Sequence, residues 1–214
     1  SLLTVLRRFE QAEAACLTAL KLQPNLAKAF HSLGVVQSAS GRLDEAEKNF
    51  KKALSIEPSN GQTLTNLASV YTSQMQYDQA ISLFKHVVKV NPNSAEAHTN
   101  LGVCYSENGQ LQKALRCFEH TLAIDPDNID ALYAIATSGK KLLSTNNLQQ
   151  LESLLKSPSI SLEKKVKINF ALAWQADKRG LPLPAITFCK AGNNLRKKLL
   201  EEKDHVFDPI THVE

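Results

Sequence analysis

The chain has 214 residues, of which 43% are apolar and 21% are charged, and its formal net charge is +4. This composition is ordinary for a globular or repeat protein, and so mild a charge gives no argument for a nucleic-acid partner. No run of about 18 apolar residues occurs, so the sequence predicts no membrane-spanning helix.

An internal repeat of 34 residues organises most of the chain, and proline is its clearest marker. The prolines are Pro24, Pro58, Pro92 and Pro126. An alanine stands twelve residues before each proline, at positions 12, 46, 80 and 114. Eight residues before the prolines stand Cys16, Phe50, Phe84 and Phe118. So many coincidences at one spacing indicate a repeat protein.

Each unit is predicted to form two helices joined by a turn. In the last regular unit we expect a helix over about 95–108, a turn at Gly109 and a helix over about 111–124 that stops before Pro126. Glycine suits the left-handed end of a helix, and proline cannot continue one.

Two glycines stand inside predicted first helices, where glycine costs about 1 kcal/mol relative to alanine. They are Gly34 and Gly102. A close approach of the paired helix would offset this cost, and we expect Ala46 and Ala114 to be the small residues that face them.

The recurring order of a Leu-Gly step, Tyr, Ala, Phe and Pro resembles the tetratricopeptide repeat (TPR) family. The pattern is nearly complete in residues 27–60, 61–94 and 95–128. The resemblance implies an all-α fold, in which antiparallel helix pairs stack into a right-handed superhelical solenoid with a concave inner face.

The period weakens towards both ends of the chain. Residues 1–26 read as the second helix of an incomplete TPR. Residues 129–161 read as a degenerate TPR-like pair, with helices over about 129–143 and 148–156. Residues 162–203 form a further TPR-like pair with an extended last helix, and residues 204–214 are predicted to be a linker or tail.

The C-terminal stretch carries a second, narrower resemblance. Phe170 to Ala173, Gly192-Asn193 and Leu195-Arg196, followed by Asp208 and His212, are similar to the segment that joins TPR arrays to a sulfotransferase domain in certain bacterial fusion proteins. The resemblance implies that a sulfotransferase domain follows in the parent protein. The 214 residues themselves contain no phosphate-cradling loop, so no catalytic residue is predicted in them.

A polar stripe along the first helices is the candidate binding surface. Asn66 and Asn100 stand in register one unit apart, and a carboxamide can both donate to and accept from one peptide unit. Inner-face asparagines hold peptide backbones in some TPR superhelices, including those of O-linked N-acetylglucosamine transferases. The predicted peptide-binding residues are Asn66, Asn100, Thr65, Thr99, Ser69, Gln62, Glu96, His31 and Val103.

The alternative interpretation is a polar stripe that only remains hydrated. A carboxylate clamp is disfavoured, because Thr65 and Thr99 stand where that site needs cations. The same stripe continues further along the chain with Tyr133, Thr137, Phe170, Trp174 and Lys178.

The cysteines and histidines suggest neither catalysis nor a metal site. The four cysteines form no C-x-x-C pair, no N-x-[ST] site occurs, and both facts favour a cytoplasmic setting. We expect all four cysteines to fill the core, with Cys16 and Cys189 in places where Phe stands elsewhere. His31 and His98 are placed at the groove. No cofactor is predicted.

The sequence therefore predicts a non-catalytic protein-interaction module that binds an extended or helical peptide of a protein partner in its concave groove, and that docks substrates if a sulfotransferase follows. The alternative is a structural fragment of a transferase with no ligand of its own. Self-association through residues 1–26 is a third prediction, since the missing partner helix would expose Leu3, Leu6 and Phe9.

Overall fold

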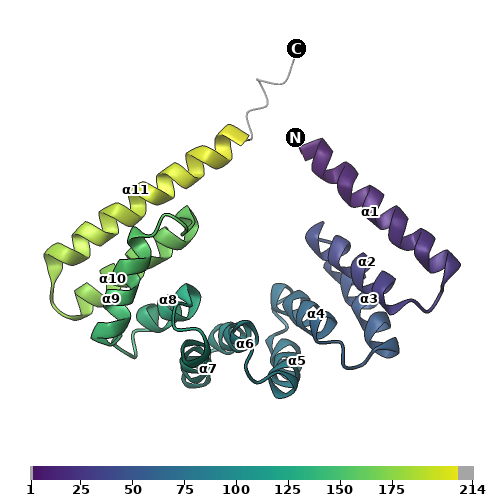
Figure 1. The fold of residues 1–214 in the computed structure, drawn as a ribbon, viewed down its shortest axis with the longest axis horizontal. Helices are drawn as coiled ribbons and strands as arrows, with labels where there is room; N and C mark the ends of the chain where they lie inside the picture. The colour runs from purple at the N-terminus through teal and green to yellow at the C-terminus, as the bar shows by residue number, and fades with distance from the viewer. Residues whose placement is uncertain (1, 207–214) are drawn as a thin grey trace, which may run out of the picture. The chain divides into compact units, whose positions relative to one another are not determined.

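The computed structural model describes residues 2–206, with side chains described for 8–202, and every regular element in that range is a helix. The predicted all-α fold is confirmed for these residues (Figure 1). The helices are α1 (Leu2–Leu22), α2 (Ala27–Ala39), α3 (Leu43–Ile56), α4 (Gly61–Ser73), α5 (Tyr77–Val90), α6 (Ala95–Glu107), α7 (Leu111–Ile124), α8 (Ile129–Thr137), α9 (Thr145–Lys156), α10 (Leu162–Lys178) and α11 (Pro182–Val206).

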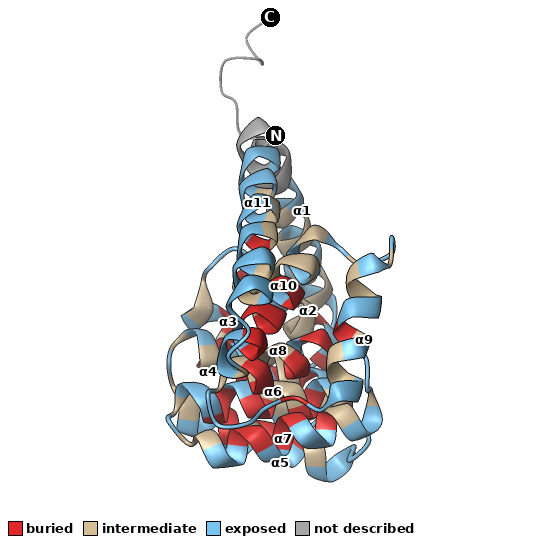
Figure 2. Cartoon of the chain, turned by 90° about the vertical axis from the view of Figure 1, so that its left-hand side faces the viewer, coloured by how far each residue is buried: buried red, intermediate tan, exposed pale blue. Residues whose placement is uncertain are grey.

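The helices form two compact units, residues 1–114 and 115–214, and the division falls within α7. In the first unit each helix from α1 to α5 packs against the next one in the chain, so that α6 is the last helix of the series. In the second unit α8, α9 and α11 all pack against α10. Figure 2 shows that buried residues line the sides on which helices meet, whereas α11 is largely exposed.

The predicted close approach at Gly34 is confirmed, but its partner is a different residue. A Cβ built on Gly34 would lie 2.8 Å from two ring carbons of Phe50, on the paired helix α3. Phe50 and Ala46 are both fully buried. The aromatic ring, and not the predicted alanine, therefore occupies the space that the glycine leaves. Gly102 is buried in α6.

The predicted turn of the last regular unit is also confirmed. α6 ends at Glu107, Gly109 has a left-handed φ of +73°, and α7 spans Leu111–Ile124. The first helices α4, α6 and α8 begin with a side-chain cap that the sequence analysis did not identify, whereas α2 has none. Asn60 accepts a hydrogen bond from the backbone N–H of Thr63 at 3.0 Å, and such caps satisfy an otherwise unpaired donor.

The helix predicted over 129–143 is shorter than expected. α8 ends at Thr137, and Gly139 has a φ of +71°, which glycine adopts without steric cost. α9 begins three residues earlier than predicted, because the Ser144 hydroxyl caps it by accepting from the backbone N–H of Asn147 at 3.1 Å.

Two side chains at the C-terminal end of α10, Gln175 and Arg179, hold the segment after α8. Gln175, 1% exposed, accepts a hydrogen bond from the Leu143 N–H at 2.8 Å and donates to the Ala136 carbonyl at 3.0 Å. Arg179 donates to the Leu143 carbonyl at 2.6 Å. These bonds satisfy backbone groups that would otherwise be left without a partner where the helix stops.

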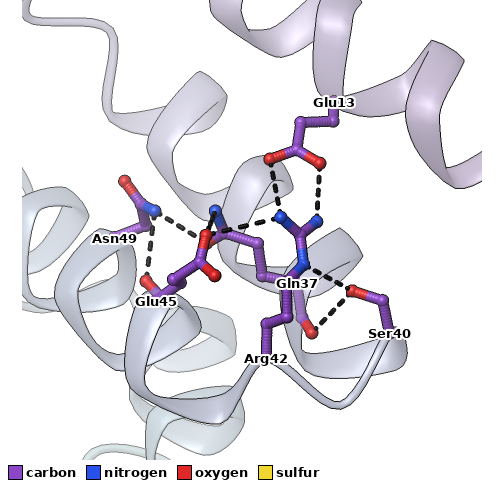
Figure 3. A network of polar contacts seen from close by, with 6 residues as sticks. All are labelled: Glu13, Gln37, Ser40, Arg42, Glu45 and Asn49. Carbon is purple, nitrogen blue, oxygen red and sulfur yellow. Dashed lines mark hydrogen bonds and ion pairs between the residues drawn. The ribbon is translucent and has the colours of Figure 1, made fainter.

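A network of polar side chains joins α1 to the first full helix pair (Figure 3). Arg42 donates to both carboxylate oxygens of Glu13, at 3.1 and 2.5 Å. Gln37 stands where the next two units have tyrosine, and its amide donates to Glu45 at 3.2 Å and accepts from Asn49 at 2.7 Å. The atypical glutamine is thus satisfied by α3.

The two chain ends differ partly from the predictions. α11 extends to Val206, so residues 204–206, which were placed in a tail, are helical. Residues 207–214, including Asp208 and His212, lie outside the described part of the chain. The side chains of Leu3 and Leu6 also lie outside it, and Phe9 is half-buried.

Candidate functional site

The Asn100 side chain lines a cavity of about 230 Å³ between α4, α5 and α6, within the first unit. Ser69 and Thr72 line it from α4, Val103 lines it from α6, and Phe84 contributes from α5. Three predicted site residues, Ser69, Asn100 and Val103, are therefore brought together. Val103 keeps 39% of its surface exposed, so the cavity offers an apolar wall beside a carboxamide.

The hydroxyl groups of this surface are less available for hydrogen bonds to a ligand than the sequence suggested. Ser69, Thr72 and Thr99 each donate to the carbonyl oxygen four residues earlier in their own helix, at 3.0, 2.9 and 2.8 Å. Each hydroxyl has one hydrogen, so these residues can only accept hydrogen bonds from a ligand.

The two carboxamides differ from the hydroxyls. Asn66 on α4 and Asn100 on α6 are both half-buried. Within the part of the chain that the structure describes, neither side chain is hydrogen-bonded to another protein group. Each therefore keeps a donor and an acceptor for an external partner.

Two further candidates lie on the same pair of helices. Thr65 is half-buried on α4, and its carbonyl is the acceptor for Ser69. Glu96 is exposed in the first turn of α6, where a carboxylate interacts favourably with the helix dipole. This placement gives Glu96 a structural role in addition to the predicted binding role.

His31 and Gln62 line a different cavity of about 440 Å³ between α2, α3 and α4. Nδ1 of His31 lies 2.9 Å from Oγ1 of Thr63, and that hydroxyl donates its hydrogen to Asn60 at 2.9 Å. Nδ1 of His31 must therefore be the donor, which leaves Nε2 as the acceptor of the neutral ring. Burial lowers the pKa of His31, so the neutral form is favoured near pH 7.

His98 is not at the groove. It is buried in α6, and its Nε2 lies 3.0 Å from the carbonyl oxygen of Pro92. His98 stands at the register of Leu64 in the preceding unit, which is a core position. The prediction that placed His98 on the binding surface is wrong, because this face of α6 packs into the protein.

The cysteines divide into buried and accessible ones. Cys104 and Cys117 are buried as predicted, and burial raises the pKa of the Cys117 thiol to about 11. Cys16 is half-buried. Cys189 is exposed, so the prediction that it fills the core is wrong. Among residues 8–202, no three His, Cys, Asp or Glu side chains gather as a metal site requires.

A cavity of the second unit is lined partly by residues that were noted on the stripe but were not chosen as candidates. It measures about 630 Å³ and is lined from α8, α10 and α11. Tyr133, Phe170 and Trp174 line it. The signal that could have identified it is the gathering of aromatic residues on the stripe in a chain with few aromatics.

Some lysines of this unit form ion pairs with acidic side chains. Lys141 pairs with Glu119, and Lys167 pairs with Asp130. These pairs are exposed and contribute little stability, but they reduce the net charge of the surface around them.

Comparison with known proteins identifies the repeats. Residues 27–60 and residues 60–127 each match a family model described as tetratricopeptide repeat. The chain therefore carries tetratricopeptide repeats over residues 27–127. No protein with a curated description matches the chain in sequence.

Solved structures resemble the chain over nearly its whole length. PilF of Pseudomonas aeruginosa is 19% identical, with a TM-score of 0.71, and the match covers 95% of this chain and 92% of that one. MamA from Desulfovibrio magneticus RS-1 is 18% identical, with a TM-score of 0.57 over 90% and 89% of the two chains. YrrB, described as a TPR protein with an unusual peptide-binding site, is 25% identical, with a TM-score of 0.57 over 88% and 87%.

These likenesses support the helical-repeat fold. No helix within residues 2–206 is both long and apolar enough to cross a membrane.

Proposed function

We propose that this chain is a non-catalytic protein-interaction module whose first unit binds an extended peptide through Asn66 and Asn100. The observation that supports the proposal is the position, burial and hydrogen bonding of these two side chains. They stand at one register on α4 and α6, are half-buried, and have no hydrogen-bond partner among the described residues. A buried polar group without a partner is costly, so partly buried amides are ready to pair with a ligand.

The surroundings of Asn100 suit a peptide backbone. The adjacent hydroxyl oxygens of Ser69 and Thr72 can accept hydrogen bonds, and Val103 offers an apolar contact for a small side chain. Recognition through backbone amides gives affinity without strict sequence preference. The likeness to YrrB, which is described as having a peptide-binding site, supports this proposal.

The remaining candidates take secondary roles in the proposal. Gln62 and the free Nε2 of His31 would contact the same peptide or its neighbour from the cavity between α2, α3 and α4. Thr65, Thr99 and Glu96 would form the margin of the surface.

The test is the double variant Asn66→Ala with Asn100→Ala. Binding to a partner isolated with the wild-type chain should weaken at least tenfold, which corresponds to about 1.4 kcal/mol. The melting temperature should stay almost unchanged, because no protein group loses a hydrogen bond. The matched control is Asn146→Ala, an exposed residue of α9. Equal affinity of the double variant and the wild type would refute the proposal.

The sulfotransferase connection remains a separate prediction. Gly192, one of the residues that carry that resemblance, has a packing explanation, because a Cβ there would lie only 3.2 Å from the Cβ of Asn169 and 3.4 Å from the Phe170 ring. The alternative function, a structural part of a transferase without a ligand of its own, depends on the same connection. Reading the coding sequence beyond Glu214 for a strand, a phosphate-binding loop and a helix tests both.

A further inference from the structure

The cavity between α8, α10 and α11 has the size and lining of a binding pocket. Its volume of about 630 Å³ falls in the range of sites that hold small ligands or side chains. Trp174 and Ile186 line it and are still 41% and 51% exposed. Large apolar side chains that share one cavity and stay exposed mark a surface that a partner covers.

The polar groups of the cavity are few and lie among basic residues. Asp177, Lys190 and Asn193 are the charged and amide groups that line it. The ammonium group of Lys178 lies 5.3 Å from the centre of the Trp174 ring. Residues 162–200, which include α10 and most of α11, contain nine Lys or Arg and only two acidic residues.

Several of these cations are engaged within the protein. Lys167 pairs with Asp130, Arg179 donates to Leu143, and Lys197 pairs with Glu201 at 3.8 Å. Even so, the segment keeps a basic excess, and Lys190 is exposed at the cavity itself. A basic surface around an apolar pocket complements an acidic partner with an apolar anchor.

We propose that this cavity binds a peptide segment in which an aromatic or branched apolar side chain is flanked by aspartate or glutamate. The apolar side chain would occupy the space beside Trp174 and Ile186, and the acidic residues would lie near Lys190 and Lys178. This site goes beyond the proposed function, because it lies in the second unit and uses neither Asn66 nor Asn100.

The first experiment selects the ligand without assuming its sequence. A displayed library of random peptides is enriched on the 214-residue chain and depleted on the Ile186→Ser variant. We expect the surviving peptides to combine an aromatic or branched apolar residue with Asp or Glu. Survivors that are basic, or the absence of any peptide that depends on Ile186, would overturn the proposal.

The second experiment uses Trp174, the one tryptophan of the sequence, as a reporter. A selected peptide without tryptophan is titrated into the 214-residue chain, and we expect the fluorescence emission to shift to shorter wavelength as the indole loses water. Unchanged emission at saturating peptide would show that the peptide binds elsewhere. A shift on concentrating the protein alone would assign the pocket to a second copy of the chain. Either result would overturn the proposal.

Matched variants distinguish a loss of binding in the pocket from a general disturbance of α11. Ile186→Ser should weaken binding about tenfold, whereas Leu183→Ser, which removes a 78% exposed side chain of the same helix, should not. Lys190→Glu should weaken binding several-fold more than Lys198→Glu does. The Asn66→Ala and Asn100→Ala double variant should bind the selected peptide normally, so a failure here is distinguishable from a failure of the proposed function.

Discussion

Gly34 and Phe50 approach so closely that a Cβ at position 34 would lie 2.8 Å from the aromatic ring. Real Cβ atoms do not come this near to other atoms, so Gly34→Ala requires the buried Phe50 ring to move. We expect a net loss of stability of roughly 1–3 kcal/mol, despite the better helix propensity of alanine. Urea-induced unfolding followed by circular dichroism measures the effect.

The control for this prediction is Gly61→Ala, in the first turn of α4. A Cβ on Gly61 would meet nothing within 4 Å. This variant should be neutral or slightly stabilising. A Gly34→Ala protein as stable as Gly61→Ala would show that the packing of α2 against α3 is looser than described.

The contact between Glu13 and Arg42 should make the docking of α1 dependent on pH. Hydrogen bonds from Arg42 hold the pKa of Glu13 below its ordinary value of 4.5. A lowered carboxyl pKa stabilises the fold above the unfolded-state value, and this stability is lost as the pH falls through the folded-state value. Glu13→Gln should cost up to about 1 kcal/mol at pH 7 and almost nothing in strong acid.

Amide hydrogen exchange of α1 at neutral and acidic pH measures this difference. The control is Glu10→Gln, an exposed residue of the same helix. If both variants respond alike to pH, the contact between Glu13 and Arg42 contributes nothing to the docking of α1.

Gln175 is predicted to be the residue that fixes the segment after α8. Gln175→Ala would leave the Leu143 N–H and the Ala136 carbonyl without this partner, at about 1–3 kcal/mol for each unsatisfied group. The melting temperature of the second unit should fall clearly. Gln149→Ala, on the exposed side of α9, should leave it unchanged. Equal melting temperatures for the two variants would contradict the role of Gln175.

The thiols should react in the order of their exposure. Cys189 is exposed, whereas Cys117 is buried with a pKa raised to about 11. Alkylation at pH 8 should modify Cys189 first and reach Cys104 and Cys117 only when the protein unfolds, since the thiolate is the nucleophile. Mass spectrometry of partly alkylated protein gives the order. Early labelling of Cys117 would contradict the packing of α7.

Part of the candidate site could be predicted from the sequence, because a period of 34 residues places side chains in register. Asn100, Ser69 and Val103 were expected on one surface, and they line one cavity. Hydrogen-bond partners could not be predicted in this way. The register of Ser69 does not reveal that its hydroxyl donates to the carbonyl of Thr65.

The sequence by itself determined the helix pairs of the regular repeats and the turn at Gly109, because these depend on local chemistry. Gly109 reaches a left-handed conformation cheaply, and Pro126 cannot continue a helix, whatever surrounds them. Only the tertiary structure decided which residues are buried or paired. Leu143 is hydrogen-bonded to Gln175, which lies 32 positions further along the chain. Cys189 remains exposed where a core residue was expected, because burial depends on tertiary neighbours that a local sequence pattern does not identify.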